Sequence, residues 1–162
     1  MKILAPVPDE RFLRVAIKLA HKHCQDGAGG PFGAVVVFDG KIVGRGWNKV
    51  SSTNDPTAHA EVVALRAAGQ ALGKFHLHGC VLYTSCEPCP MCLAAAYWAH
   101  VDRIVYAATR KDAANIGFDD AFLYREFSRD VKKRRVPLEQ KLRAESQGVM
   151  RAWFEMPGRV QY

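Results

Sequence analysis

Four residues in two short segments have the types and spacing of a metal site that activates water. His59 and Glu61 lie two positions apart, and Cys89 and Cys92 follow later in a Pro-Cys-x-x-Cys segment. Two cysteines three positions apart on one helical turn share a face, and a neutral imidazole completes a three-ligand set with an open fourth position. Zinc lowers the pKa of a water in that position to about 7, and Glu61 would carry the water proton. The spacing predicts one Zn²⁺ per chain, with a bound water or hydroxide, held by His59, Cys89 and Cys92.

A closed structural zinc site is the alternative. Cys86 precedes Cys89 by three positions, so a fourth sulfur ligand is available in the sequence. Such a site would be inert, as in a zinc-stabilised binding module without turnover, and it would leave Glu61 unexplained. Pro88 also favours an extended residue before it, which separates Cys86 from the next helix. We therefore favour the open site, with Cys86 as a packed or exposed thiol.

Length and cysteine content limit the class of protein. The chain has 162 residues, of which 49% are hydrophobic, so residues 1–162 suit a single domain with a real core. Five cysteines are an odd number, and Cys24, Cys80 and Cys86 show no paired framework of the secreted kind. Residues 1–10 contain no long apolar region, and no segment is apolar over the length of a membrane span. These features predict a cytoplasmic protein with no membrane contact.

The excess of basic residues leaves two interpretations open. Lys and Arg number 23 against 16 Asp and Glu, a net charge of +7. This charge is compatible with nucleic-acid binding or with a soluble, self-repelling surface. The densest basic run, residues 132–135, falls between two expected elements, and no aromatic residues alternate with it as in a nucleic-acid stripe.

Hydrophobic periodicity predicts a sheet with helices, and two of the expected helices carry His59 with Glu61 and Cys89 with Cys92. A strand, a helix and a strand at this spacing imply a parallel crossover, so both zinc-bearing helices would present their N-termini at one edge of the sheet. Positive helix ends there would favour thiolates and an anionic oxygen. The expected helices cover residues 9 to about 27, 58–67, 88–98 and 121–129, with a final amphipathic segment around Val149, Trp153 and Phe154; the expected strands cover 34–38, 41–46, 80–84 and 103–107.

The zinc motif resembles the cytidine deaminase superfamily, in which zinc-activated water attacks an amino-bearing ring carbon. Four segments resemble the small bacterial guanine deaminases within it: residues 29–33, 54–61, 83–92 and 117–120. The resemblance covers nearly the whole chain. It implies a three-layer α/β/α fold with a central mixed, mostly five-stranded sheet. It also implies zinc-dependent hydrolysis of guanine to xanthine and ammonia.

The same resemblance implies roles for further residues. Phe32 would stack on the purine, Asn48 would hydrogen-bond the ring, the backbone N–H of Ala60 would meet a ring oxygen, and Asp120 would help to move a proton to the departing ammonia. Structural interpretations stay open beside these: Phe32 as a core aromatic, Asn48 as a strand end, and Asp120 as part of a capped turn.

The resemblance finally implies a homodimer in which the C-terminal segment crosses to the partner and Tyr162 closes the partner's pocket. Aromatic residues near the end of the chain fit equally a helix docked on its own subunit. The rival function is tRNA adenosine deamination, which the net charge of +7 leaves open. The basic C-terminal helix typical of those enzymes is missing from this sequence.

Overall fold

The computed structural model describes residues 9–162. Most of residues 1–10, where the sequence predicts no apolar leader, therefore lies outside the described residues. The chain divides into two compact units, Met1–Asp120 and Ala121–Tyr162, which are described separately below. The single domain expected over residues 1–162 stays a prediction.

A mixed sheet forms the centre of the first unit. Its strands are β1 (Gly33–Phe38), β2 (Lys41–Trp47), β3 (Cys80–Cys86) and β4 (Arg103–Ala108), in the order β2-β1-β3-β4. β1 pairs antiparallel with β2 and β3, whereas β3 and β4 are parallel. Asp39 and Gly40 connect β1 to β2 with positive φ angles of 47° and 69°, which a tight hairpin turn requires. The predicted hairpin and the predicted parallel crossover are both confirmed.

The sheet has four strands among the described residues, not the five that were expected. After β4 the chain leaves the sheet as a helix, α5 (Arg110–Asn115), because Thr109 and Asp112 form a capping box at its first turn. The following segments, α6 (Ala121–Ser128) and α7 (Arg143–Glu155), are also helical. The sequence beyond β4 therefore supplies helix signals where a fifth strand would have to follow.

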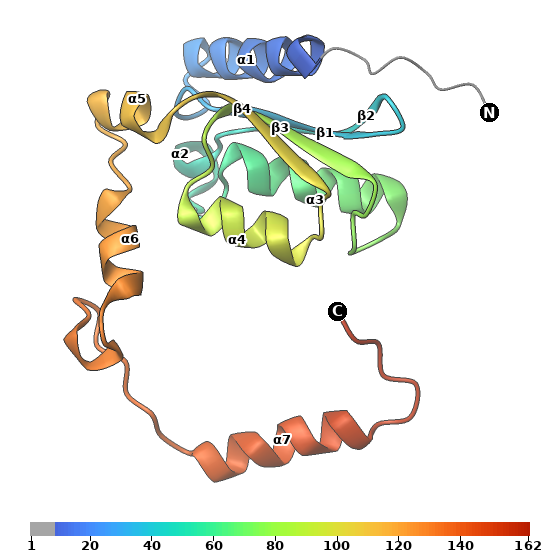
Figure 1. The fold of residues 1–162 in the computed structure, drawn as a ribbon, viewed down its shortest axis with the longest axis vertical. Helices are drawn as coiled ribbons and strands as arrows, with labels where there is room; N and C mark the ends of the chain where they lie inside the picture. Colours follow the sequence, from blue (N-terminus) through green and yellow to red (C-terminus); the bar gives the residue numbers. More distant parts are fainter. Residues whose placement is uncertain (1–8) are drawn as a thin grey trace. The chain divides into compact units, whose positions relative to one another are not determined.

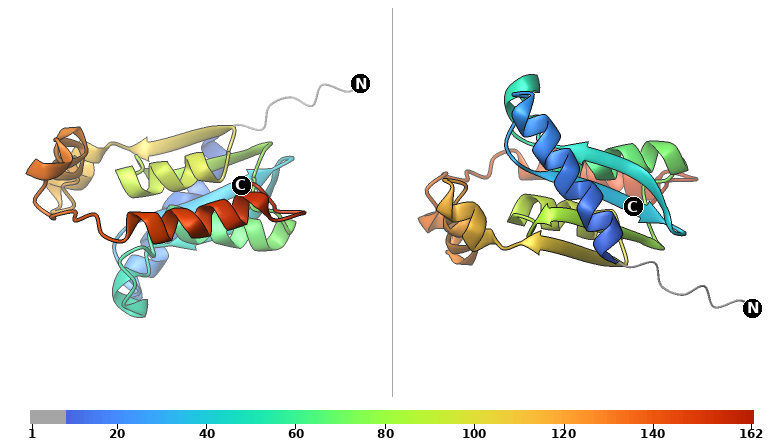
Figure 2. Two further views of the ribbon diagram at one scale, coloured as in Figure 1. Left: turned by 90° about the horizontal axis from the view of Figure 1, so that it is seen from below. Right: turned by 90° about the horizontal axis from the view of Figure 1, so that it is seen from above.

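Helices cover both faces of the sheet. α1 (Asp9–Gln25) lies on one face, and α3 (Ala60–Leu72) and α4 (Pro90–Trp98) lie on the other (Figures 1 and 2). A short helix, α2 (Val50–Thr53), connects β2 to α3. Alternate residues of β1 supply the two cores: Val35 and Val37 pack with Phe12 of α1, whereas Ala34 and Val36 pack with α3 and α4. The expected three-layer α/β/α arrangement is confirmed.

Glycine allows α3 to approach β2 closely. A Cβ atom at Gly46 would overlap the carbonyl oxygen of Ala60 and the backbone nitrogen of Ala64. A Cβ at Gly44 would collide in the same way with the backbone of α3 one turn later. Because Ala60 is the first residue of α3, the contact at Gly46 fixes the position of the helix start.

The second unit contains α6, a 3₁₀ turn (Val131–Lys133) and α7. No residue of α6 or α7 is buried, and several large apolar side chains of α7 and the following residues are exposed: Val149, Met150, Trp153, Phe154, Met156 and Val160. No helix in residues 9–162 is both long enough and apolar enough to cross a membrane.

Candidate metal centre

Two of the predicted ligands occupy N-cap positions. His59 precedes α3 and Cys89 precedes α4, both with extended backbone, and neither side chain caps its own helix. Cys92 lies in the first turn of α4, after Pro90 at the helix start. The helices therefore begin slightly later than the sequence indicated, at Ala60 and Pro90. This shift leaves the side chains of His59 and Cys89 available as ligands rather than occupied as caps.

The three ligand atoms fit one zinc ion. His59 Nδ1 lies 3.5 Å from Cys89 Sγ and 3.5 Å from Cys92 Sγ. Zinc bonds of about 2.0 Å to nitrogen and about 2.3 Å to sulfur, at tetrahedral angles, place such atoms about 3.5 Å apart. All three ligand atoms lie within 4.8 Å of one another. The site can therefore take a metal ion without large movement and with one position left for water.

Charge at the two sulfurs also fits a cation. A hydrogen bond from the Cys92 thiol is the main cause that lowers the pKa of Cys89 to about 4. The same hydrogen bond, together with burial, raises the pKa of Cys92. The two sulfurs thus share one proton among the protein groups alone. A bound zinc ion would displace that proton, because a coordinating thiol is deprotonated.

Glu61 lies beside the ligands and outside their set. Its side chain is buried, with 6% exposure, and Thr84 Oγ1 donates a hydrogen bond of 3.3 Å to Glu61 Oε1. Burial is the largest cause that raises the pKa of this carboxyl above its usual range. A carboxyl of raised pKa keeps an accepted proton to a higher pH than an exposed glutamate, which suits a general acid-base group.

The structure leaves Cys86 out of the ligand set. Its buried Sγ donates to the carbonyl oxygen of Thr109 at 3.6 Å. Burial, followed by the negative charge of Glu61, raises the pKa of the Cys86 thiol to about 11. A neutral thiol bonded to the backbone is a packed side chain, so the geometry favours the open site over the closed one.

Asn48 is buried and held in one orientation. Its Oδ1 accepts hydrogen bonds from the backbone nitrogens of Gly30 at 3.3 Å and Val50 at 3.2 Å. Both of these bonds use the oxygen, so the amide NH₂ group of Asn48 is available to donate to a ligand. Phe32 follows the glycine-rich segment that Asn48 holds, and it packs partly against the core.

Phe118 is a residue that sequence reasoning missed. Its ring meets Phe32 edge to face, with ring centroids 4.9 Å apart and an interplanar angle of 89°. Phe118 is 47% exposed, so the aromatic pair has an open side. The signal was present in the sequence, because Phe118 belongs to the same short segment as Asp120.

Asp120 is partly buried at the end of the first unit. Burial is the main cause that raises the pKa of its carboxyl, and the negative charge of Cys89 contributes further. This electrostatic effect of Cys89 associates Asp120 with the metal centre. Tyr162 belongs to the second unit, and its predicted place at the pocket stays a prediction.

The backbone N–H of Ala60 lies at the N-terminus of α3, immediately after His59. The first N–H groups of a helix have no partner within the helix, so they can donate to a ligand.

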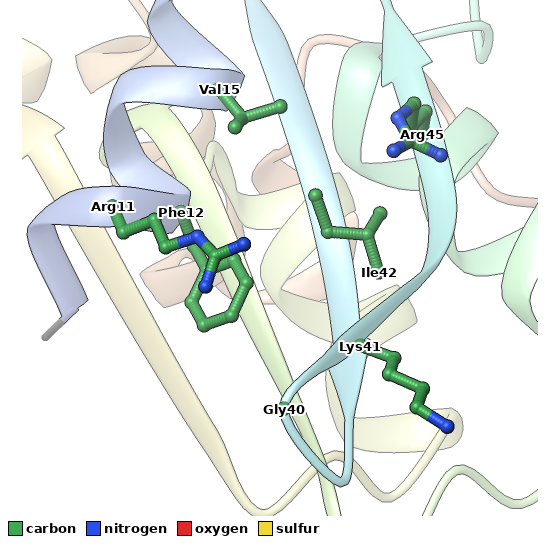
Figure 3. Close-up of a pocket in the computed structure, with 7 residues that line it drawn as sticks. All are labelled: Arg11, Phe12, Val15, Gly40, Lys41, Ile42 and Arg45. Carbon is green, nitrogen blue, oxygen red and sulfur yellow. The ribbon is translucent and has the colours of Figure 1, made fainter. Parts of the chain in front are cut away.

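A different pocket, of about 400 Å³, lies between α1 and the β1–β2 hairpin (Figure 3), and none of the predicted site residues lines it.

Residues 6–108 match the family described as the cytidine and deoxycytidylate deaminase zinc-binding region. The chain belongs to this family. The matched range contains the zinc ligand set of His59, Cys89 and Cys92 and also Glu61. The family therefore assigns zinc to the site that the geometry describes.

Three relatives show how far the similarity extends. The guanine deaminase of Bacillus subtilis is 48% identical over 153 residues, which cover 94% of this chain and 98% of the relative. Its X-ray structure superposes with a TM-score of 0.93 at 47% identity and covers 96% of this chain and 99% of that chain. A guanine deaminase from Nitrosomonas europaea has a TM-score of 0.65 at 33% identity over 74% of this chain and 68% of that chain. The tRNA-specific adenosine deaminase of Buchnera aphidicola is 40% identical over 104 residues, 64% of this chain and 68% of the relative.

Proposed function

We propose that the protein is a zinc-dependent guanine deaminase, which hydrolyses guanine to xanthine and ammonia. The observation that carries the proposal is the similarity to the guanine deaminase of B. subtilis over nearly the full length of both chains. The similarity to the tRNA-specific enzyme covers a smaller share of this chain. The similarity to the guanine deaminase therefore includes residues that the similarity to the tRNA-specific enzyme does not cover.

The proposed site combines a cation, a buried acid and donors to a flat polar ring. Zinc, when bound by His59, Cys89 and Cys92, supplies an acidified water as the nucleophile. Glu61 accepts a proton at its carboxylate and passes it to a ring nitrogen of the purine. Its burial supports this role, because a carboxyl of raised pKa keeps the proton that it accepts to a higher pH than an exposed glutamate.

Three further groups would hold the ring with C2 toward the reacting water. The Asn48 NH₂ group would donate to the ring, supported by the two hydrogen bonds that fix its Oδ1. The N–H of Ala60 would donate to a ring oxygen, supported by its place at a helix N-terminus. Phe32 would stack on the purine, with Phe118 packed against its edge.

Asp120 would deliver a proton to the departing ammonia. The raised pKa of this carboxyl supports the role, because burial keeps it protonated to a higher pH than an exposed aspartate. Glu61 and Asp120 have different environments, so Glu61 would transfer the proton during the addition of water and Asp120 during the departure of ammonia.

Ammonia release from a panel of substrates tests the proposal. The panel contains guanine, guanosine, adenine, cytidine and unmodified tRNA at matched concentrations, with xanthine identified by chromatography. We expect guanine to be the preferred substrate, because buried donors placed for one ring are left unpaired by another. Faster deamination of tRNA adenosine would overturn the proposal in favour of the rival function, which the net charge of +7 leaves open.

We further propose that the enzyme is a homodimer in which the C-terminal segment crosses to the partner and Tyr162 covers the partner's pocket. The exposed apolar side chains of α7 support an additional contact surface, since Trp153 is 40% and Phe154 is 63% exposed.

The unpaired state of all five cysteines supports the predicted cytoplasmic location, where thiols stay reduced.

A mixed dimer tests the exchange. One chain lacks the residues after α7, and the other carries Glu61→Gln and an intact tail. Each homodimer should be nearly inactive, but the mixed dimer should regain activity, because the truncated chain keeps its acid and receives its partner's tail. Full activity of the truncated chain alone would show that the tail is not needed. Verified heterodimers without activity would place the tail on its own subunit.

A further inference from the structure

Three of the six histidines gather at the end of the sheet opposite the zinc centre. His76 and His78 precede β3, and His100 follows α4. Their ring centroids lie 4.5 Å (His76 to His100), 5.1 Å (His78 to His100) and 5.6 Å (His76 to His78) apart. The zinc ligands lie at the other end of β3, so its length of about 20 Å separates the two groups.

The ring spacing agrees with three imidazoles around one metal ion. A zinc–nitrogen bond of about 2.0 Å places the ring centroid about 3.2 Å from the metal, so tetrahedral angles put two centroids about 5 Å apart. The observed separations lie around that value. Among the described residues, the three ligand atoms of the His59 centre lie within 4.8 Å of one another, and those of the histidine cluster do not. Rotation of the rings about their Cβ–Cγ bonds would therefore have to bring the nitrogens together.

The backbone that carries these histidines is fixed by hydrogen bonds between the two loops. Leu77 N donates a hydrogen bond of 2.6 Å to Ala99 O. Leu77 stands between His76 and His78 in the sequence, and Ala99 directly precedes His100. The Asp102 carboxylate accepts from Gly79 N at 3.0 Å and so joins the same loops a second time. Fixed Cα positions lower the entropy that a ligand set loses when it binds a metal.

One ring nitrogen in the cluster lacks a partner. His76 Nε2 is buried and makes no hydrogen bond in the structure. Buried polar groups are normally paired, so this nitrogen marks a place where a ligand would satisfy the protein.

We propose that His76, His78 and His100 form a second metal site, which binds a divalent transition metal of the Zn²⁺, Ni²⁺ or Cu²⁺ type. Three imidazole ligands without a thiolate or a carboxylate suit these ions and discriminate against Ca²⁺ and Mg²⁺. The exposed side chains of His78 and His100 leave the site open to solvent. A water molecule can then complete the coordination.

Zinc stoichiometry tests the second site without reference to turnover. The full chain is dialysed against buffered Zn²⁺, and zinc per chain is measured. We expect two equivalents in the parent protein and one in the double variant His78→Gln, His100→Gln. Cys92→Ser should also retain one equivalent, the one held by the histidine cluster. His21→Gln is the matched control, because His21 is an exposed histidine on α1, and it should keep two.

Substitution with Co²⁺ identifies which site is filled. A thiolate-bound cobalt ion absorbs in the near ultraviolet through sulfur-to-metal charge transfer, whereas a cobalt ion on three imidazoles does not. The first equivalent should show that band and the second should not. A parent protein that binds a single zinc, or a second equivalent that survives in the His78→Gln, His100→Gln variant, would overturn the proposal. Neither outcome bears on guanine deamination, so failure of this site is distinguishable from failure of the proposed function.

Discussion

Substitution of Glu61 by glutamine separates the proposed chemistry from the fold. The Glu61 side chain is 6% exposed, so bulk water cannot take its place in the site. Glutamine has nearly the same volume, and its Oε1 can still accept the 3.3 Å hydrogen bond from Thr84 Oγ1. The variant loses the ability to take up and release a proton, while packing and the zinc ligands remain.

The expected loss can be estimated from the chemistry that the carboxyl performs. Removal of a general acid-base group lowers the rate by about 10²–10⁴-fold. This corresponds to about 2.7–5.4 kcal/mol of lost transition-state stabilisation. We expect the effect in kcat, with a smaller change in KM, because Asn48, Ala60 and Phe32 would still hold the ring. Steady-state ammonia release from guanine gives both constants, and metal analysis of the same sample gives zinc per chain.

A matched carboxylate-to-amide change controls for surface charge. Glu10→Gln removes an exposed acid on α1 that forms a 2.7 Å ion pair with Arg14, and it should leave kcat unchanged. A Glu61→Gln protein that keeps one zinc in the His59 centre and turns over within tenfold of the parent rate would refute the proton-transfer role. Loss of zinc together with activity would instead show that Glu61 holds the ligands in place.

Three further changes test the ligand set, the packing beneath it and an ion pair remote from it. Cys92→Ser should empty the His59 centre while Cys86→Ser keeps its zinc, as measured by zinc per chain; the reverse result would make our ligand assignment wrong. Gly46→Ala and Gly44→Ala should each cost about 1–3 kcal/mol in urea unfolding because of overpacking, but only Gly46→Ala should weaken zinc binding, since it displaces the start of α3. Asp9→Asn should remove about 1 kcal/mol or less of stability at neutral pH. The hydrogen-bonded guanidinium of Arg103 holds the pKa of the Asp9 carboxyl below its usual range, so this contribution is present above the usual pKa of an aspartate and disappears as the pH falls through the lower folded value. Unfolding curves at pH 7 and pH 3 that differ equally between parent and variant would contradict the last expectation.

The ligand set was predictable because its determinants are local. Two cysteines three positions apart at a helix start share a face, and the His-x-Glu segment together with them resembles the zinc deaminases. The parallel pairing of β3 and β4 was predictable for a similar reason, since a strand, a helix and a strand of these lengths close in few ways.

Contacts between distant segments were not predictable from the same patterns. Thr84 lies on a buried strand, and nothing in its neighbours indicates that its hydroxyl meets Glu61. Phe118 meets Phe32 only because the loop after α5 returns to the glycine-rich segment. The fifth strand was expected from the resemblance, and the helix signals at Thr109 and beyond replace it. These features depend on tertiary packing, which periodicity does not specify.

The position of the ligands joins the packing of the sheet to the chemistry of the site. His59 and Cys89 are N-cap residues, so their Cβ directions are set by where α3 and α4 begin. The start of α3 is set in turn by the close contact of Ala60 with Gly46 of β2. The positive ends of both helices also favour the thiolates and a negative oxygen on the substrate. A change of one methyl group beneath the helix should therefore alter metal affinity without touching a ligand, which is why the paired glycine variants distinguish local packing from general stability.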